Sequence, residues 1–445
     1  MNKKMVFRLL FIFTFSLLLY LVFGFNINNE DGFNNFMFSY ALVKGEIPYL
    51  DFNTISTPLY MFYQAIFLLI SNQYIMFLIG QCILITVMFY ILFKEYDKKA
   101  YYVLLAMIGL KFSGFASTYN FMCLFMMFVL LYLENNYNKK DYLIGFIIGL
   151  CALSKHTIGL FFVLPTLFYY YKDIKRIGKR FIGFMIPWLV LIIYLIINKA
   201  LYSFIDLCFL GLFDFGTSNG GKFSIWIIVS IVLLIISIIY YIKNKSIRNL
   251  YLIFTFFFAF PIFDLLHFMF YVTCFVYMLL PSFKEVNKSR TILIIGLLLE
   301  LFVFNVAMIF RGVSSAYYDS SYKHLFAKRD FTISIKNVSK KIKVCEYYED
   351  KKPIIISGIK PIYDVSHDKR IDYYNVYLYG NHGYNGTEKM IKSISKMHKQ
   401  YFLVNILDYE TDDKYSQTNK KITKYIIDNS KLIEEKDGFW LYYKE

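Results

Sequence analysis

Two adjacent carboxylates, Glu30 and Asp31, are the residues of this sequence whose types and position most directly suggest chemistry. They follow a first apolar segment, 6–25, and open a short loop that leads to the next apolar segment. A charged side chain close to a bilayer is costly, so a functional role is the default. A carboxylate there can act as a general base toward a hydroxyl group. Asp31 is our candidate base, and Glu30 could take its place.

The rest of the first loop, 26–58, supplies further candidates. Apolar residues recur at helical spacing in it: Phe33, Phe36, Met37, Tyr40 and Ala41. This pattern predicts a helix over 33–44 that lies in the membrane interface with its apolar face down. Asp31 could instead be the N-cap of this helix, and Glu30 a solvated loop charge. The motif Gly-x-x-Pro-Tyr-x-Asp-Phe over 45–52 then places Tyr49 and Asp51 in the same loop.

Three later apolar segments, 101–133, 142–171 and 250–282, each carry a polar break near the middle. We expect each to be a helical hairpin that turns at its break, at 117–120, 154–157 and 264–267. The arms of the second hairpin have about 12 to 14 residues and rise roughly 20 Å in a hydrocarbon core about 30 Å thick. Lys155 and His156 should therefore lie below the membrane surface, surrounded by protein or a water-filled cavity. His267 lies in the third break.

These elements belong to a polytopic α-helical membrane protein. Hydrophobic residues make up 58% of the 445, and long apolar runs such as 225–241 and 291–310 recur over the first 310 positions. We interpret 6–25 as a retained first helix because no small-residue cleavage site follows it. The six cysteines are scattered, which is typical of small core residues rather than of disulfides or a metal site.

The placement of basic residues predicts the topology. Of the 24 Lys and Arg residues before Arg311, 19 fall in six segments: 1–8, 94–99, 134–141, 172–180, 243–248 and 284–290. The positive-inside rule assigns these segments and the N-terminus to the cytoplasm and gives about 11 crossings. The segment 59–70 is expected as a short helix against the outer leaflet. Because membrane topology explains the net charge of +16, we do not expect nucleic acid as a partner.

The composition changes after Arg311, where charge becomes dense and apolar runs shorten. Predicted strands at 353–357, 373–379, 401–406 and 439–443 alternate with predicted helices at 387–398 and 417–429. The sequence thus predicts two domains, a transmembrane domain over 1–310 and a small α/β domain over 311–445. An odd number of crossings makes the second domain extracytoplasmic.

The first loop has an acid after the first helix, the motif over 45–52, and Pro58-Leu59 at the start of the next helix. In these features it resembles membrane glycosyltransferases of the GT-C superfamily. These include protein O-mannosyltransferases and the aminoarabinose transferase of lipid A. The stretch 149–155 is similar to their Gly-Leu-(small)-x-Leu-(Ser/Thr)-Lys segment, and His267-Phe268 with Leu280-Pro281 to their late His-(Tyr/Phe)…Leu-Pro segment.

The resemblance implies a sugar donor linked to polyprenyl phosphate and a glycan, lipid or protein acceptor on the outer face of the cell membrane. Asp31 or Glu30 would be the catalytic base, while Lys155, His156 and His267 would bind the donor phosphate. Asp51 and Tyr49 would orient the acceptor, and Asp51 could alternatively orient Lys155. No cofactor is required because the leaving group is already a lipid phosphate, although some relatives use a divalent metal.

Two departures keep alternatives open. Many relatives have Asp before Glu in the first loop, or His-Lys before the Pro that opens the next helix, and this chain has neither. The rival functions are an envelope polysaccharide polymerase or flippase, a secondary transporter, and a membrane scaffold for the outer domain. A histidine in a helical bundle can also be a simple core residue. Lys111 and Glu300 fall within predicted crossings, where we expect them to pair with polar groups of the bundle. Asp206 and Asp214, in the second outer loop, 199–223, are expected to be solvated.

Overall fold

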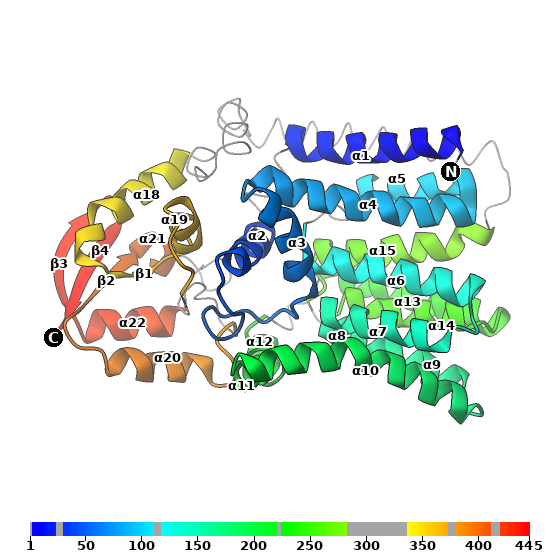
Figure 1. Cartoon of the computed structure of the whole chain (residues 1–445). Coiled ribbons are helices and arrows are strands. Elements are labelled where there is room, and N and C mark those ends of the chain that lie inside the picture. The colour runs from blue at the N-terminus through cyan, green and yellow to red at the C-terminus, as the bar shows by residue number, and fades with distance from the viewer. Residues whose placement is uncertain are drawn as a thin grey trace.

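The computed structural model describes residues 2–23, 30–109, 117–219, 224–260, 262–282, 336–372, 380–410 and 419–445. A bundle of helices forms one end of the molecule, and a small sheet with its own helices forms the other (Figure 1). Short helices from two connecting segments lie between these two parts. The N-terminus is at the far end of the bundle and the C-terminus is at the opposite end of the molecule.

The helices of the bundle run side by side with roughly parallel axes (Figure 1). In chain order they are α1 (Lys3–Phe23), α4 (Tyr74–Tyr96), η1 (Asp97–Lys99), α5 (Ala100–Gly109), α6 (Tyr119–Asn136), α7 (Asp141–Ser154), α8 (His156–Gly159), η3 (Leu160–Phe162), α9 (Val163–Tyr169), α10 (Ile174–Ile197), α13 (Ile225–Lys243), α14 (Ile247–Phe254), η5 (Thr255–Phe258), α15 (Leu265–Leu279) and η6 (Leu280–Ser282). Three stretches among the described residues are long and apolar enough to cross a membrane, Tyr74–Met107, α10 and α13. The predicted crossing 291–310 lies outside the described residues.

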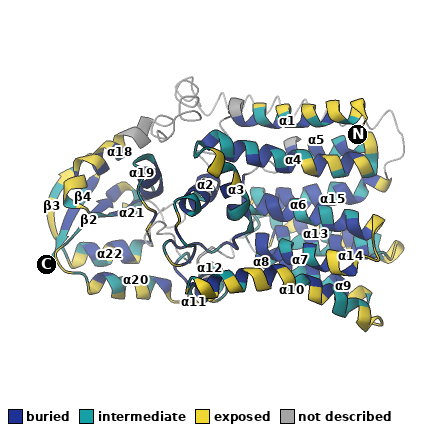
Figure 2. Ribbon diagram, viewed as in Figure 1, coloured by how far each residue is buried: buried dark blue, intermediate teal, exposed yellow. Residues whose placement is uncertain are grey.

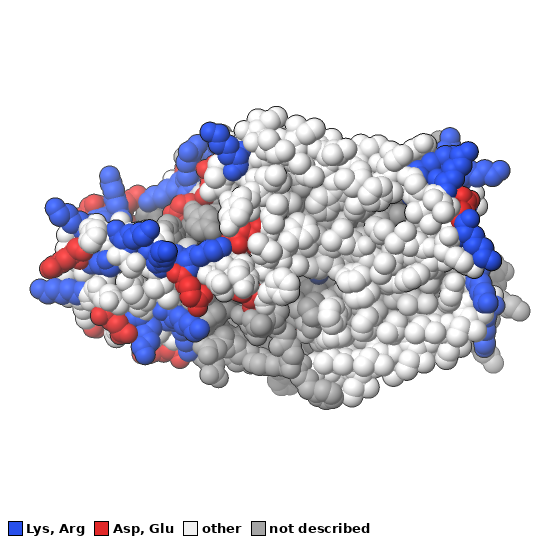
Figure 3. Space-filling model, turned by 90° about the horizontal axis from the view of Figure 1, so that it is seen from below, with Lys and Arg blue, Asp and Glu red and all other residues white. Residues whose placement is uncertain are grey.

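Charged side chains gather at the two ends of the molecule (Figure 3). In this view, a broad band with almost no visible acidic or basic side chains separates the charged C-terminal domain from a row of mostly Lys and Arg side chains at the far end of the bundle. Exposed residues along α10 are visible in Figure 2, and apolar side chains such as Val190 of α10 and Ile242 of α13 are more than 60% exposed. An uncharged belt with exposed apolar side chains supports membrane association.

Ion pairs, a hydrogen bond and a cation–π contact hold the predicted cytoplasmic segments together at the far end of the bundle. Arg8 forms an ion pair with Asp97, and Asn135 donates a hydrogen bond to Glu95. The Arg248 guanidinium lies 5.3 Å from the centre of the Tyr96 ring. The contacts Arg176–Asp141, Arg180–Asp141 and Arg180–Glu134 connect 134–141 with 172–180. Five of the six basic segments therefore share one end, as the sequence predicted, and the sixth lies outside the described residues.

The second predicted hairpin is confirmed. The helix α7 ends at Ser154, Lys155 has an extended conformation, and α8 and η3, which lead into α9, pack back against α7. Gly159 allows this turn, because a Cβ atom on it would lie 2.2 Å from the backbone nitrogen of Ala152. The third hairpin is also confirmed, since α14 and η5 are followed by a turn and by α15, and Asp264 caps α15. The helices α5 and α6 flank the first predicted turn.

Glycines also bring α7 and α10 into close contact. A Cβ atom on Gly145 would lie 1.9 Å from the carbonyl oxygen of Arg180, and one on Gly183 would lie 2.1 Å from that of Tyr142. Small residues at helix interfaces let backbones approach where lipid provides no hydrophobic driving force. This contact holds the α7–α8 turn, and with it Lys155, in a fixed position relative to α10.

The connecting segments contain α2 (Glu30–Val43), α3 (Leu59–Ile70), α11 (Leu201–Ile205), the π-helix η4 (Asp206–Leu210) and α12 (Leu212–Asn219). The helix α3 has the predicted bounds, and it buries Tyr60 and Leu68 while Leu69 and Ile70 are exposed. The alternative role of Asp31 as an N-cap is wrong, because α2 begins at Glu30 and Asp31 lies inside it. An interfacial helix should leave its polar side open, but Asn35 and Ser39 on that side are buried, and α19 of the C-terminal domain contacts α2.

The C-terminal domain has a four-stranded sheet in the order β1-β2-β4-β3, with β1 (Ile354–Ile356) parallel to β2 (Gln400–Asn405). The strands β3 (Lys431–Lys436) and β4 (Phe439–Lys444) form an antiparallel hairpin, and Leu403 pairs with Leu441 between β2 and β4. The helices are α18 (Lys336–Tyr347), η7 (Glu349–Lys351), α19 (Lys360–Ser366), α20 (Gly386–Ser395), α21 (Ile406–Glu410) and α22 (Lys420–Asp428).

Helices cover both faces of this sheet. The helix α18 packs with Leu403 and Leu441 on one face, and α20 and α22 pack with Phe402 and Val404 on the other. Three predicted strands and both predicted helices are confirmed to within a few residues. The predicted strand 373–379 and the predicted domain boundary at 311 lie outside the described residues. All six cysteines are buried and free.

Candidate functional site

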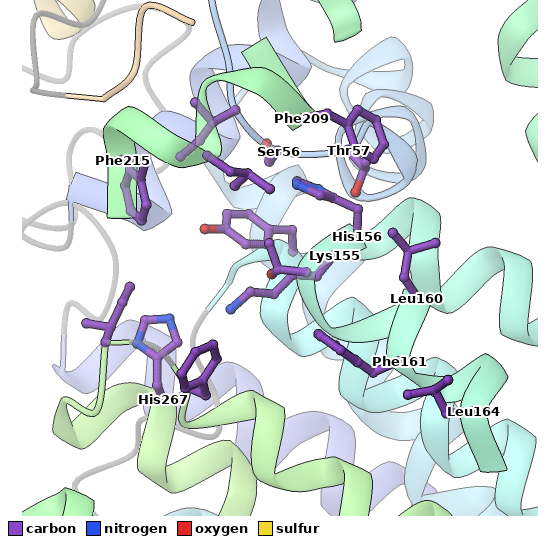
Figure 4. A pocket seen from close by; sticks show the side chains of 16 residues that line it. Ser56, Thr57, Lys155, His156, Leu160, Phe161, Leu164, Phe209, Phe215 and His267 are labelled. Atoms are coloured by element: carbon purple, nitrogen blue, oxygen red, sulfur yellow. The ribbon is translucent and has the colours of Figure 1, made fainter. Parts of the chain in front are cut away.

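A cavity of about 610 Å³ lies where the bundle meets the connecting segments (Figure 4). Its polar lining residues are Ser56, Thr57, Tyr119, Lys155, His156, Thr157 and His267. Its apolar lining residues are Ile55, Leu160, Phe161, Leu164, Phe209, Leu212, Phe215, Phe260 and Ile262. A mostly apolar wall with a few convergent polar groups is typical of a small-molecule site.

Five parts of the chain form this wall. They are the loop before α3, the first turn of α6, the α7–α8 turn with the helices that follow it, the η4–α12 segment, and the segment from η5 to α15. The three residues that the sequence predicted for phosphate binding, Lys155, His156 and His267, all line the cavity. They come from two different hairpins, and the fold brings them together at the polar turns of those hairpins.

Lys155 is the cation of the cavity wall. Its extended backbone ends α7 and begins α8, so its side chain leaves the helix axis at the turn. The Nζ atom lies 5.8 Å from the centre of the Tyr119 ring, a cation–π contact. Figure 4 shows the Lys155 side chain extending across the cavity toward the side that carries His267. A half-buried ammonium group at this position can attract an anion into the cavity.

His267 is held by Asp264, a residue that we did not predict to be part of the site. The Asp264 Oδ1 atom accepts hydrogen bonds from the backbone nitrogen and from Nδ1 of His267, both at 2.8 Å. With Nδ1 protonated, the carboxylate fixes the orientation of the ring. The signal was present in the sequence, since an Asp three residues before a His at a helix start can cap the helix and reach the ring.

His156 lies deeper in the wall and is 4% exposed. Its ring centre is 5.2 Å from that of Phe209, and the backbone of Cys208 lies beside it. Neither ring nitrogen makes a hydrogen bond of good geometry within the described part of the chain. Buried polar atoms normally have partners, so these nitrogens are available to a polar group of a bound molecule.

Tyr49 and Asp51 shape the loop before α3, and neither lines the cavity. The Tyr49 hydroxyl donates a 2.8 Å hydrogen bond to the carbonyl oxygen of Ser56, and Oδ2 of Asp51 accepts one of 2.7 Å from the backbone nitrogen of Ile47. Tyr49 has a φ of 69°, which is uncommon for a residue with a side chain. Both residues therefore fold the loop that carries Ser56 and Thr57 into the cavity wall.

The predicted bases Glu30 and Asp31 occupy the first turn of α2, and their side chains lie outside what the structure describes. Their catalytic role stays a prediction. Lys111 and Glu300 also lie outside the described residues. In the described part of the chain, no group of three or more His, Cys, Asp and Glu side chains could hold a metal ion.

One prediction for the second connecting segment is wrong. Asp206, expected to be solvated, is 7% exposed and forms an ion pair of 2.8 Å with Lys389 of the C-terminal domain. Asp214 accepts a hydrogen bond of 3.3 Å from the backbone nitrogen of Gly386. Both acids follow α10 in the sequence, but their partners lie 183 and 172 residues later, in the C-terminal domain, so nothing local indicated them.

No protein-family model matches this chain, and neither a curated protein nor a solved structure shows significant similarity to it.

Proposed function

We propose that this protein is an integral membrane glycosyltransferase of the GT-C type, which moves a sugar from a polyprenyl-phosphate carrier to a cell-envelope acceptor. The observation that carries the proposal is the cavity itself. Lys155, His156 and His267 gather in its wall, and Leu160, Phe161 and Leu164 extend that wall along η3 and α9. An anionic headgroup with an apolar chain is the ligand that matches both parts of this lining.

The transfer breaks the bond between the anomeric carbon of the sugar and the phosphate oxygen of the carrier, and forms one to the acceptor oxygen. Polyprenyl phosphate leaves with the negative charge, which Lys155 and a hydrogen bond from His267 would stabilise in a site of low dielectric constant. The acceptor hydroxyl gives its proton to Asp31 or Glu30 at the start of α2. No metal or cofactor is needed to balance these steps.

The proposal also includes a topology. The basic end of the bundle would lie in the cytoplasm, with about 11 crossings in total. The two connecting segments and the C-terminal domain are at the opposite end, which would then be extracytoplasmic (Figure 1). A reporter enzyme that is active only outside the cytoplasm, fused after Glu445, should be active. Activity of a cytoplasm-specific reporter at the same position would contradict this arrangement.

The experiment that tests the function is sugar transfer in membranes that contain the protein. Membranes are incubated with radiolabelled polyprenyl-phosphate sugars, and the wild type is compared with Asp31→Asn and Lys155→Ala. We expect transfer by the wild type and a loss of about 100-fold or more in either variant. Equal transfer by all three proteins would contradict the site, and no transfer from any donor would favour a polymerase, flippase or transporter.

A further inference from the structure

The C-terminal domain contacts the cavity wall on the side that faces away from the cavity. Residues 380–389, here named the support segment, lead into α20 and contact both connecting segments that form the wall. The wall residues Phe209, Leu212 and Phe215 belong to η4 and α12, and Ile55 and Ser56 belong to the loop before α3. The support segment lies against the same two pieces of chain, outside the cavity.

An ion pair joins the support segment to η4. The Lys389 Nζ atom lies 2.8 Å from Oδ2 and 3.0 Å from Oδ1 of Asp206, and the backbone nitrogen of Tyr384 donates a further hydrogen bond of 3.2 Å to Oδ1. Gly383 leaves room for this carboxylate, because a Cβ atom there would lie 2.3 Å from Oδ2. Asp206 is the first residue of the π-helix that carries Phe209, so the pair fixes the start of the wall.

Two glycines of the support segment pack directly on the backbone of the wall. Gly380 has a φ of +80°, and a Cβ atom on it would lie 2.5 Å from Cα of Phe215. A Cβ atom on Gly211, between η4 and α12, would lie 2.9 Å from Cα of Gly383. Backbone therefore meets backbone at two points, and the wall cannot move outward while the support segment stays in place.

The support segment also holds the loop before α3. Nδ2 of Asn53 donates a hydrogen bond of 3.0 Å to the carbonyl oxygen of Asn381 and lies 3.1 Å from Nδ1 of His382. His382 is 2% exposed, so this contact is buried. Asn53 precedes the wall residues Ile55 and Ser56 by only a few positions. Both pieces of the wall, the η4–α12 segment and the loop before α3, thus make polar contacts with the C-terminal domain.

We propose that Asp206 and Lys389 are positioning residues, through which the C-terminal domain fixes the width of the cavity and so its affinity for a polyprenyl phosphate. Only the choice of ligand rests on the proposed function. The domain then acts on ligand binding without touching the ligand, because the support segment lies outside the cavity wall. Coupling through packed segments of this kind changes affinity by about 2- to 30-fold.

Two measurements on the full-length protein in detergent test this proposal. The first is binding of radiolabelled undecaprenyl phosphate to the wild type, Lys389→Met, Lys389→Arg and Gly380→Ala. We expect Lys389→Met and Gly380→Ala to bind at least about 5-fold more weakly and Lys389→Arg to bind like the wild type. The control is Lys340→Met, which removes an exposed ion pair with Asp437 in the same domain and should not change binding.

The second measurement is amide hydrogen exchange over 206–215, which needs no ligand. We expect faster exchange there in Lys389→Met and Gly380→Ala and unchanged exchange in Lys340→Met. Unchanged exchange in the first two variants would overturn the proposal, whatever the ligand. Wild-type protein that does not bind undecaprenyl phosphate but exchanges as expected would contradict the proposed function and leave the positioning role supported.

Discussion

The Lys155 ammonium group lies 5.8 Å from the centre of the Tyr119 ring, and this contact joins two polar breaks of the apolar sequence. Tyr119 opens α6, whereas Lys155 separates α7 from α8. The predicted turn at Lys155 is confirmed, and the residues just before the first break, 110–116, lie outside the described residues. The two breaks meet at the polar part of the cavity, so the residues that interrupt the hydrophobic pattern are those that a ligand would contact.

Lys155 should decide whether an anionic lipid binds. Replacing it with Ala removes the cation from a mostly apolar cavity, so we expect affinity for a polyprenyl phosphate to fall by about 100-fold. Equilibrium binding of radiolabelled lipid to the purified protein measures this. The matched control is Lys175→Ala, which removes an exposed lysine in a basic segment at the far end of the bundle. Equal losses in both variants would mean that general charge, not the cavity, attracts the lipid.

Asp264 should act through His267. In Asp264→Asn the ring loses the carboxylate that orients it, so we expect binding of the lipid phosphate to weaken by about 10-fold. The loss should require the ring, so Asp264→Asn should weaken binding no further in a protein that already carries His267→Gln. Lipid binding to the two single variants and the double variant tests this. The same loss from Asp264→Asn with and without the ring would show that Asp264 only caps α15.

Gly159 should be essential for the α7–α8 turn. A Cβ atom there would lie 2.2 Å from the backbone nitrogen of Ala152, and backbone cannot move aside cheaply. We expect Gly159→Ala to destabilise the fold by about 2 kcal/mol or more. The control is Gly178→Ala in α10, where no atom lies within 4 Å of the added Cβ and helix propensity predicts a gain of about 0.5 to 1 kcal/mol. Thermal unfolding in detergent distinguishes the two, and similar effects would contradict this close approach of Gly159 to Ala152.

Glu46 should make stability depend on pH. Its side chain is buried between the first loop and the C-terminal domain, where Oε1 accepts a hydrogen bond of 3.1 Å from the backbone nitrogen of Ile371. Burial raises its pKa from 4.5 to about 7. The folded protein thus holds this proton more tightly than the unfolded chain does. The contribution of Glu46 is therefore fully present below about pH 4.5 and is lost as the pH rises to about 7.

The Glu46→Gln variant isolates this effect. Burial lowers the pKa of His382 to about 4, which acts in the opposite direction, so the wild-type curve alone mixes the two. Relative to the wild type, Glu46→Gln should gain stability as the pH rises from about 4.5 to about 7, and the difference should be constant above that. Unfolding temperatures measured across this range provide the test. A difference that does not change with pH would contradict the assignment to Glu46.

The local pattern of apolar and polar residues was sufficient to predict those elements whose environment is uniform along their length. The helix α3 was predicted with its observed bounds because one apolar run is bounded by Pro58 and by a polar break. The strand β2 was predicted because its residues are apolar and buried between two layers of helices. The strand β3 was missed, since charged residues such as Glu434 and Glu435 hide a strand at the edge of the sheet.

Long-range partners could not be predicted. The local sequence predicts that Asp206 is a solvated loop acid. In the structure it pairs with Lys389, which lies 183 residues later in the sequence. Likewise α2 has the pattern of an interfacial helix, but Asn35 and Ser39 on its polar side are buried, and α19 of the C-terminal domain contacts it. The sequence identified three polar side chains of the cavity, Lys155, His156 and His267. It did not indicate the apolar wall from η4 and α12, whose place depends on the C-terminal domain.

The most direct test of a lipid-phosphate cavity is photo-crosslinking with a polyprenyl phosphate that carries a photoreactive group near its headgroup, followed by mass spectrometry of the labelled peptides. We predict labels within 155–164 and 209–215, competed by unlabelled polyprenyl phosphate and lost in Lys155→Ala. Labels confined to the exposed faces of α10 and α13, unchanged by competitor and by Lys155→Ala, would contradict a lipid-phosphate site in this cavity.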